Sequence, residues 1–277
     1  MNIALRIIYR IYQTFIALPL ILLASVITSL TTIIGCFLGN GHFWGYYPGK
    51  LWSRFICTVL LLPVKIEGRE HLKKGQSYVF VANHQGFFDV FLIYGYLNRN
   101  FKWMMKQSLR KMPLVGPACA AARHIFVDKR GASKIRATYD KARETLQDGM
   151  SLVVFPEGAR TFTGHMGQFR RGAFMLADEL QLPVCPLTIN GSFNVMPRTR
   201  DFHYAIWHPL SLTIHEPIPY TGNEERGGRN EESHETIGRE TMQKAYAAIN
   251  SALVPEYQGY VLVLTSYLSE RYAFQAE

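Results

Sequence analysis

The four cysteines of this 277-residue chain form neither a metal-binding nor a disulfide pattern. They are scattered, with no Cys-x-x-Cys pair, at Cys36, Cys57, Cys119 and Cys185. Zinc knuckles and disulfide frameworks require closely spaced cysteines, so the sequence predicts neither, and it predicts no metal site. We expect reduced thiols that are mostly buried.

The sequence also lacks the signature of a serine hydrolase. No Gly-x-Ser-x-Gly elbow is present. Residues 108–111 fit a Ser-x-x-Lys pattern, but the Lys-Thr-Gly and Ser-Asp-Asn elements that accompany this pattern in such enzymes are missing. We therefore predict that Ser108 is an ordinary helix residue.

Acidic residues are in the minority. The chain has 30 Lys and Arg against 21 Asp and Glu, a formal net charge of +9. This surplus favours an anionic partner such as phospholipid head groups, a phosphorylated metabolite or nucleic acid. The basic residues cluster around short motifs instead of forming one stripe, and no nucleic-acid-binding motif is present. We expect no nucleic acid partner.

Charged residues are absent from residues 11–49. Between Arg10 and Lys50 there is no Asp, Glu, Lys or Arg, and residues 15–38 are apolar apart from a few Ser and Thr. About 20 residues cross a bilayer. We predict a helical membrane anchor over residues 1–64, with 15–38 as a transmembrane or re-entrant segment. This stretch is too long for a signal peptide, and a buried core helix is the other alternative.

Beyond residue 64, short apolar runs alternate with segments of helix length. The predicted strands are 78–82, 125–127, 151–155 and 184–189, and the predicted helices are 133–147, 172–180 and 233–252. This alternation predicts an α/β domain over residues 65–220. A polar loop, a helix and a C-terminal tail over 221–277 are expected to pack on that domain.

A histidine and an aspartate follow the first of these strands. Residues 83–89 read Asn-His-Gln-Gly-Phe-Phe-Asp. A bend at Gly86 would bring the Asp89 carboxylate to one imidazole nitrogen of His84 and leave the other nitrogen free. His84 would then be a base for a substrate hydroxyl that attacks an acyl carbonyl. Taken alone, the two residues fit equally a structural histidine and a helix cap.

A second polar motif follows the strand 151–155. Residues 155–161 read Phe-Pro-Glu-Gly-Ala-Arg-Thr. Gly158 allows close approach of the backbone to a ligand, and Arg160 offers the planar donor fork that suits phosphate. Further cations stand at 170–171 and at 129–130. The alternatives are a tight turn with a surface ion pair and, at 129–130, a solvated loop.

These clusters, in this order and spacing, resemble the glycerolipid acyltransferase family, most closely the bacterial 1-acyl-glycerol-3-phosphate acyltransferases. That family is marked by a histidine and an aspartate separated by four residues, a Phe-Pro-Glu-Gly-Thr-Arg-Ser block and two weaker blocks. This chain has Ala159 and Thr161 where the family usually has Thr and Ser, and Lys129 where arginine is usual. Residues 184–187 resemble the fourth, apolar block, and the resemblance covers roughly residues 50–215.

The resemblance implies a single α/β domain with a central mixed sheet flanked by helices, preceded by the N-terminal membrane anchor. It implies His84 as general base and Asp89 as its orienting partner. The residues expected to bind substrate are Glu157, Gly158, Arg160, Lys129, Arg130 and Arg171. Which of the two cations at 129–130 meets the phosphate is left open.

The implied reaction moves a fatty acyl group from acyl-CoA or acyl carrier protein to the sn-2 hydroxyl of 1-acyl-glycerol-3-phosphate. The product would be phosphatidic acid for phospholipid synthesis, made at the cytoplasmic face of a bacterial cytoplasmic membrane. The expected partners are a lysophospholipid, an acyl thioester, membrane lipid and, with that donor, acyl carrier protein.

No cofactor or metal is expected, because the carrier thiol is already a good leaving group. Other acceptors stay open: glycerol 3-phosphate, another lysophospholipid or a lyso-aminolipid. The alternative outside enzymes is a protein that only binds anionic membranes.

Overall fold

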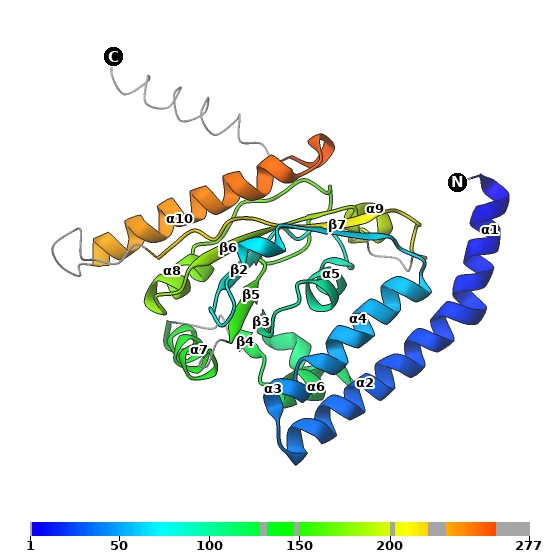
Figure 1. The fold of residues 1–277 in the computed structure, drawn as a ribbon, viewed down its shortest axis with the longest axis horizontal. Helices are drawn as coiled ribbons and strands as arrows, with labels where there is room; N and C mark the ends of the chain where they lie inside the picture. The colour runs from blue at the N-terminus through cyan, green and yellow to red at the C-terminus, as the bar shows by residue number, and fades with distance from the viewer. Residues whose placement is uncertain (1, 128–131, 147–149, 200–202, 221–230, 259–277) are drawn as a thin grey trace.

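A seven-stranded mixed sheet forms the centre of the molecule, in the order β1-β7-β6-β2-β5-β3-β4 (Figure 1). The computed structural model describes residues 2–127, 132–146, 150–199, 203–220 and 231–258. The strands are β1 (Val64–Glu67), β2 (Val79–Ala82), β3 (Phe101–Lys106), β4 (Ile125–Val127), β5 (Ser151–Val154), β6 (Val184–Asn190) and β7 (Leu210–Ile214). Neighbouring strands are parallel except β6 and β7. The predicted α/β class with a mixed sheet is confirmed.

Helices cover both faces of this sheet (Figure 1). On one face lie α7 (Ala132–Thr145), α8 (Gly172–Glu179) and α10 (Glu231–Ala252), and on the other lie α2 (Leu18–Leu38), α4 (Tyr47–Val59) and α5 (Asp89–Tyr96). The shorter helical elements are α3 (Gly41–Trp44), η2 (Arg69–His71), η3 (Gln107–Lys111), α6 (Val115–Ala121), α9 (Ser192–Val195) and η5 (Pro255–Tyr257).

Alternate side chains of β2 enter two separate cores. Phe80 and Ala82 pack with the core that α4 and α5 cover, whereas Val79 and Val81 pack with the core under α7, α8 and α10. All four are fully buried. A strand buried on both faces has a continuous apolar sequence, which is why this run was readable as a strand.

Most of the predicted elements are present, with small shifts at their ends. The four predicted strands are β2, β4, β5 and β6, and the three predicted helices are α7, α8 and α10. Ser108 lies in the 3-10 helix η3. All four cysteines are free, with Cys57 and Cys185 buried and the other two half-buried, as expected.

The N-terminal segment is one long helix. It runs from Ile3 to Leu38 through α1 (Ile3–Tyr12), a π-helical turn η1 (Gln13–Ala17) and α2, and it is long and apolar enough to cross a membrane. Gln13 in the π turn is buried, and its side chain donates to the carbonyl of Ala205 at 2.9 Å and accepts from the N–H of Ala205 at 3.0 Å. These bonds fasten the helix to the sheet domain.

The N-terminal helix and α10 both pack on the sheet domain. Along α2, the indole N–H of Trp52 donates to the Ser25 hydroxyl at 2.9 Å, and α2 also packs against α6. At the other end of the chain, α10 packs on α8 and β6. The predicted boundaries between residues 64 and 65 and between 220 and 221 stay predictions.

Candidate active site

The imidazole of His84 is hydrogen-bonded to the carboxylate of Asp89. Asp89 Oδ2 accepts from His84 Nδ1 at 2.7 Å and from the N–H of Gly86 at 3.0 Å. The His84 side chain is 16% exposed and that of Asp89 is fully buried. Because the carboxylate is an acceptor, Nδ1 carries the proton, and Nε2 is the nitrogen that can accept a proton from a substrate.

The backbone of the loop after β2 is held by neighbouring segments. Asn83 pairs with the backbone of Ile189, accepting from its N–H at 2.8 Å and donating to its carbonyl at 2.9 Å. A Cβ atom at Gly86 would lie 2.3 Å from the carbonyl oxygen of Ser192. The predicted bend at Gly86 is thus a close approach of two backbones that leaves no room for a side chain.

The carboxylate of Glu157 supports the same loop from the other side. Its Oε1 accepts from the N–H of His84 at 2.6 Å and its Oε2 accepts from the N–H of Gly167 at 2.8 Å. Burial raises the pKa of Glu157 to about 7, although both amide donors favour the carboxylate. The Phe155 ring stacks on the His84 imidazole, with centroids 3.8 Å apart. Glu157 therefore contacts the backbone that positions His84.

Three guanidinium groups gather beside the imidazole–carboxylate pair. Arg160 is half-buried, with its Cζ 5.7 Å from the centre of the Phe87 ring, and its carbonyl accepts from Arg198 Nη1 at 2.9 Å. Arg170 lines the same cavity. Gly158 has a left-handed φ of 79°, and a Cβ there would lie 3.2 Å from Arg170 Nε. Guanidinium groups that line one cavity can bind phosphate or another anion.

The cavity that these groups share with His84 has a volume of about 840 Å³. Its walls come from β3, β4 and β5 on the sheet and from α2, α4 and α6. Most of the lining is apolar, for example Trp52, Met104 and Val115. An apolar cavity that also contains a histidine and arginines fits a ligand with a hydrocarbon tail and an anionic head.

Part of this chain matches a known protein family. Residues 63–190 match a family model described as Acyltransferase. The matched range contains the His84–Asp89 pair and the 155–161 loop. This chain carries an acyltransferase-family domain.

Curated proteins similar to this acyltransferase domain are named 1-acyl-sn-glycerol-3-phosphate acyltransferase. The chain is 26% identical over 215 residues to one from Chlamydomonas reinhardtii, covering 77% of this chain and 60% of that protein. It is 29% identical over 174 residues to a chloroplastic one from Arabidopsis thaliana, covering 62% of this chain and 48% of that protein. The chain thus spans about half to three fifths of the length of these relatives.

A solved structure shows the same fold. It is the 1-acyl-sn-glycerophosphate (LPA) acyltransferase PlsC from Thermotoga maritima, which superposes with a TM-score of 0.63 over 87% of this chain and 95% of that chain. The two sequences are 24% identical. This similarity shows a shared fold across most of both chains.

The structure brings some of the predicted substrate-binding residues of the acyltransferase domain to the cavity. Gly158 and Arg160 line it, and among the described residues its lining includes Arg170 but not Arg171. Arg171 is exposed at the N-terminal cap of α8. Lys129 and Arg130 lie outside the described residues. The substrate-binding and catalytic roles, and the expected absence of a metal and a cofactor, stay predictions.

The sequence interpretation noted Arg170 as a cation near the 155–161 motif but did not include it among the predicted substrate-binding residues. It missed Arg198. Arg198 had no sequence signal, since it follows α9 in a segment without a recognisable motif and reaches the acyltransferase cavity only through the folding of the chain.

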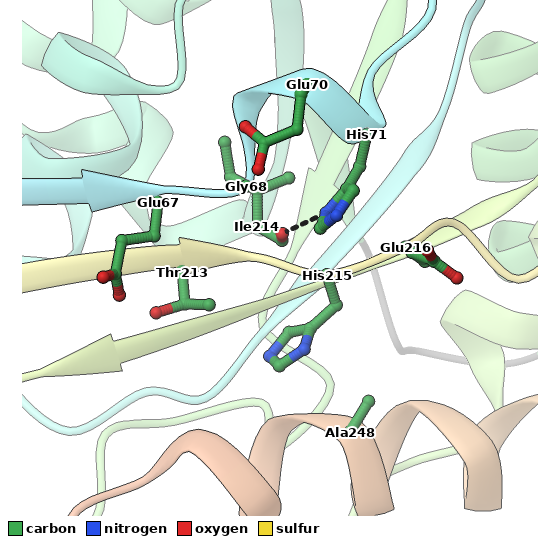
Figure 2. Close-up of a pocket in the computed structure, with 9 residues that line it drawn as sticks. All are labelled: Glu67, Gly68, Glu70, His71, Thr213, Ile214, His215, Glu216 and Ala248. Carbon is green, nitrogen blue, oxygen red and sulfur yellow. Dashed lines mark hydrogen bonds between the residues drawn. The ribbon is translucent and has the colours of Figure 1, made fainter.

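A second hollow, of about 520 Å³, lies at the opposite edge of the sheet, where β1, β7 and α10 meet (Figure 2). Its titratable residues are Glu67, Glu70, His71, His215 and Glu216. His71 Nδ1 pairs with the carbonyl of Ile214 at 2.8 Å, and His215 Nε2 pairs with the hydroxyl of Thr188 at 2.8 Å. Burial, with a smaller effect of His71, lowers the pKa of His215. Both histidines therefore have structural partners in this hollow.

Proposed function

We propose that this protein transfers a fatty acyl group from an acyl thioester to the sn-2 hydroxyl of 1-acyl-glycerol-3-phosphate, giving phosphatidic acid. The observation that carries this proposal is the His84–Asp89 pair in an apolar cavity beside three arginines. The pair supplies a base, the guanidinium groups supply a phosphate site, and the cavity holds hydrocarbon. The names of the relatives agree with this combination.

In the proposed reaction His84 transfers one proton from the acceptor hydroxyl to the leaving thiolate. Its Nε2 takes the proton of the acceptor hydroxyl while the hydroxyl oxygen attacks the carbonyl carbon of the thioester. Asp89 stabilises the imidazolium that forms. The tetrahedral intermediate then collapses, the carbon–sulfur bond breaks, and Nε2 returns the proton to the leaving thiolate. The acyl group passes directly to the acceptor, and the same step serves acyl-CoA or acyl carrier protein as donor.

The phosphate of the acceptor would bind to Arg160, Arg170 and Arg198. Each can donate two parallel hydrogen bonds to phosphate oxygens, which fixes the orientation of the glycerol as well as its position. Because these arginines line the cavity that His84 also lines, a bound phosphate would hold the free hydroxyl near Nε2. Lys129 and Arg130, which the sequence predicts to bind substrate, are proposed as further cations for the phosphate.

We further propose that the protein works while embedded in a membrane surface. The long N-terminal helix exposes many large apolar side chains, among them Leu22, Leu23, Ile27, Leu30 and Ile34. The same helix is bonded to the domain at Gln13 and Ser25. A helix fastened along its length cannot cross the bilayer without drawing the polar domain in with it. This favours a helix that embeds in one leaflet over one that spans.

The membrane itself and its face stay predictions. A bacterial cytoplasmic membrane, with the site facing the cytoplasm, was expected from the family resemblance. The relatives include a chloroplastic protein and one from yeast, so they support a membrane lipid substrate more than any one compartment.

The direct test is an acyl-transfer assay in liposomes of anionic phospholipid. Purified protein is incubated with oleoyl-CoA or oleoyl-acyl carrier protein and, in turn, lysophosphatidic acid, glycerol 3-phosphate, lysophosphatidylcholine and a lyso-aminolipid. Released thiol and lipid product are measured for the wild type and for His84→Ala. We expect phosphatidic acid from the wild type alone.

The other outcomes separate the alternatives. Product from a different acceptor would keep the mechanism and change the acceptor. If neither donor acylates any acceptor while the protein still sediments with the liposomes, the protein only binds anionic membranes, and the proposal is wrong.

A further inference from the structure

Three polar side chains line the apolar cavity from α2 and from the residue before β4, and α2 packs against α6, which ends at Ala121 close before that residue. This polar patch consists of Ser29 and Thr32 on α2 and His124 beside Ile125 of β4. Their exposed fractions are 7%, 7% and 3%. Each is therefore enclosed by protein except where it faces the cavity.

His124 lines this cavity and carries a ring N–H that has no acceptor among the described residues. Its Nδ1 accepts from the backbone N–H of Trp103 at 3.2 Å, which leaves the proton on Nε2. Burial, with a smaller effect of Lys102, lowers the pKa of His124 to about 3, so the ring is neutral. Within the described part of the chain, no residue accepts from Nε2.

The hydroxyls of Ser29 and Thr32 on α2 likewise lack a hydrogen-bond partner among the described residues. Ser29 and Thr32 are three residues apart, so they lie on one face of the helix. Ser25, one turn earlier, contrasts with them, since it donates to the carbonyl of Ile21 and accepts from Trp52. All three side chains line the cavity, and the two hydroxyls and His124 Nε2 have no hydrogen-bond partner among the described residues, so a ligand or water in the cavity would complete their hydrogen bonds.

The patch lies away from the reacting centre. The Phe155 ring stacks on His84, and the Trp103 ring stacks in turn on Phe155 at a centroid distance of 5.6 Å. His124 is bonded to the backbone of Trp103. Two aromatic rings therefore separate the patch from the imidazole of His84. An acyl chain whose thioester lies at His84 would pass the patch part-way along its length.

We propose that Ser29, Thr32 and His124 form a subsite for an oxygen atom carried part-way along the acyl chain, so that mid-chain hydroxyacyl thioesters are the preferred donors. The inference rests on the proposed acyl transfer. A plain hydrocarbon chain would displace water from the patch and leave its polar groups unpaired. A chain with a hydroxyl at that depth accepts from His124 and exchanges hydrogen bonds with the two α2 hydroxyls.

A matched pair of donors tests this subsite. Ricinoleoyl-CoA and oleoyl-CoA have the same length and unsaturation and differ by one mid-chain hydroxyl. A β-hydroxyacyl-CoA of that length places the hydroxyl beside the thioester instead. We expect the wild type to use ricinoleoyl-CoA with a kcat/KM about tenfold above that for oleoyl-CoA, the factor for one net hydrogen bond. No gain is expected from the β-hydroxyl.

Substitutions on α2 test whether the patch causes the preference for ricinoleoyl-CoA. The double variant Ser29→Ala with Thr32→Val should bring the ratio of the two kcat/KM values close to one. Thr31→Val on the same helix, outside the cavity lining, should keep the wild-type ratio. Because the measured quantity is a ratio within one protein preparation, a loss of folded protein does not change it.

Three results would overturn the subsite. A wild-type ratio near one would mean that the patch only holds water. A preference that survives in the double variant would place the recognition elsewhere. Failure to transfer either acyl group would contradict the proposed acyl transfer itself, and the subsite with it.

Discussion

Histidines and carboxylates lie together at two places on the sheet, with different consequences. After the central strand β2, His84 is bonded to the Asp89 carboxylate and lines an apolar cavity. At the β1–β7 edge, His71 and His215 are bonded to a backbone carbonyl and a threonine hydroxyl, although three glutamates line the same hollow (Figure 2). The residue types alone therefore do not identify a site; the hydrogen-bond partner of the imidazole does.

Of the substitutions at the two places, removal of the His84 imidazole should reduce acyl transfer the most. We expect His84→Ala to lower kcat by roughly 10²–10⁴-fold, the range for loss of a general base. The variant should still sediment with liposomes, because the N-terminal helix is unchanged. Retention of more than a tenth of the wild-type kcat for phosphatidic acid formation would contradict the role of His84.

Asp89→Asn tests whether the carboxylate partner distinguishes His84 from the histidines of the β1–β7 hollow. The amide can still accept from Nδ1, but it cannot stabilise an imidazolium by charge. We expect kcat to fall by about a hundredfold or more with little change in KM. An unchanged kcat with a lowered melting temperature would show that Asp89 only stabilises the loop before α5.

The cavity near His84 is lined by arginines that can bind a phosphate, whereas the described lining of the β1–β7 hollow contains no Lys or Arg. Arg160→Gln should raise KM for lysophosphatidic acid by about tenfold, because one charge-assisted hydrogen bond is lost. Monoacylglycerol, which has no phosphate, serves as the control acceptor and should show no such change. We expect a smaller rise for Arg171→Gln, since Arg171 is absent from the described cavity lining. The reverse order would assign phosphate binding to Arg171.

The raised pKa of Glu157, whose carboxylate holds the backbone of His84, predicts a pH-dependent stability. Its pKa is raised by burial from 4.5 to about 7. Between these values the folded protein holds a proton that the unfolded chain has released, so the stability from this group is present at low pH and is lost as the pH rises towards 7. The free energy of unfolding in urea should therefore fall relative to Glu157→Gln over this range. A difference between the two proteins that is constant with pH would contradict the raised pKa.

His215→Ala should have the smallest effect. Acyl transfer should remain at the wild-type rate, because the β1–β7 hollow lies across the sheet from the cavity. Loss of the bond to Thr188 should lower the free energy of unfolding by about 1 kcal/mol. A large loss of activity in a folded His215→Ala protein would give this second hollow a function in the reaction.

The strands that the sequence interpretation missed have physical explanations. Lys102 interrupts the apolar pattern of β3, yet it is buried in the fold because its Nζ donates to the carbonyl of Ala122 at 2.8 Å. β1 and β7 are short and pair with each other across most of the domain, Val64 with Leu210. The local sequence pattern does not indicate a pairing partner so far along the chain. In contrast, β2 and β5 are apolar throughout and could be predicted as strands from their own sequence.

The sequence by itself determined the His84–Asp89 pair, because the two residues are five positions apart on one loop and the bend at Gly86 is local. It also determined the long apolar N-terminal helix, since length and composition suffice for that. Only the tertiary structure decided what surrounds the pair. Arg198 from beyond β6 and the hydroxyls of α2 reach one cavity through the order of the strands and the packing of α2, and both depend on contacts between residues far apart in the chain.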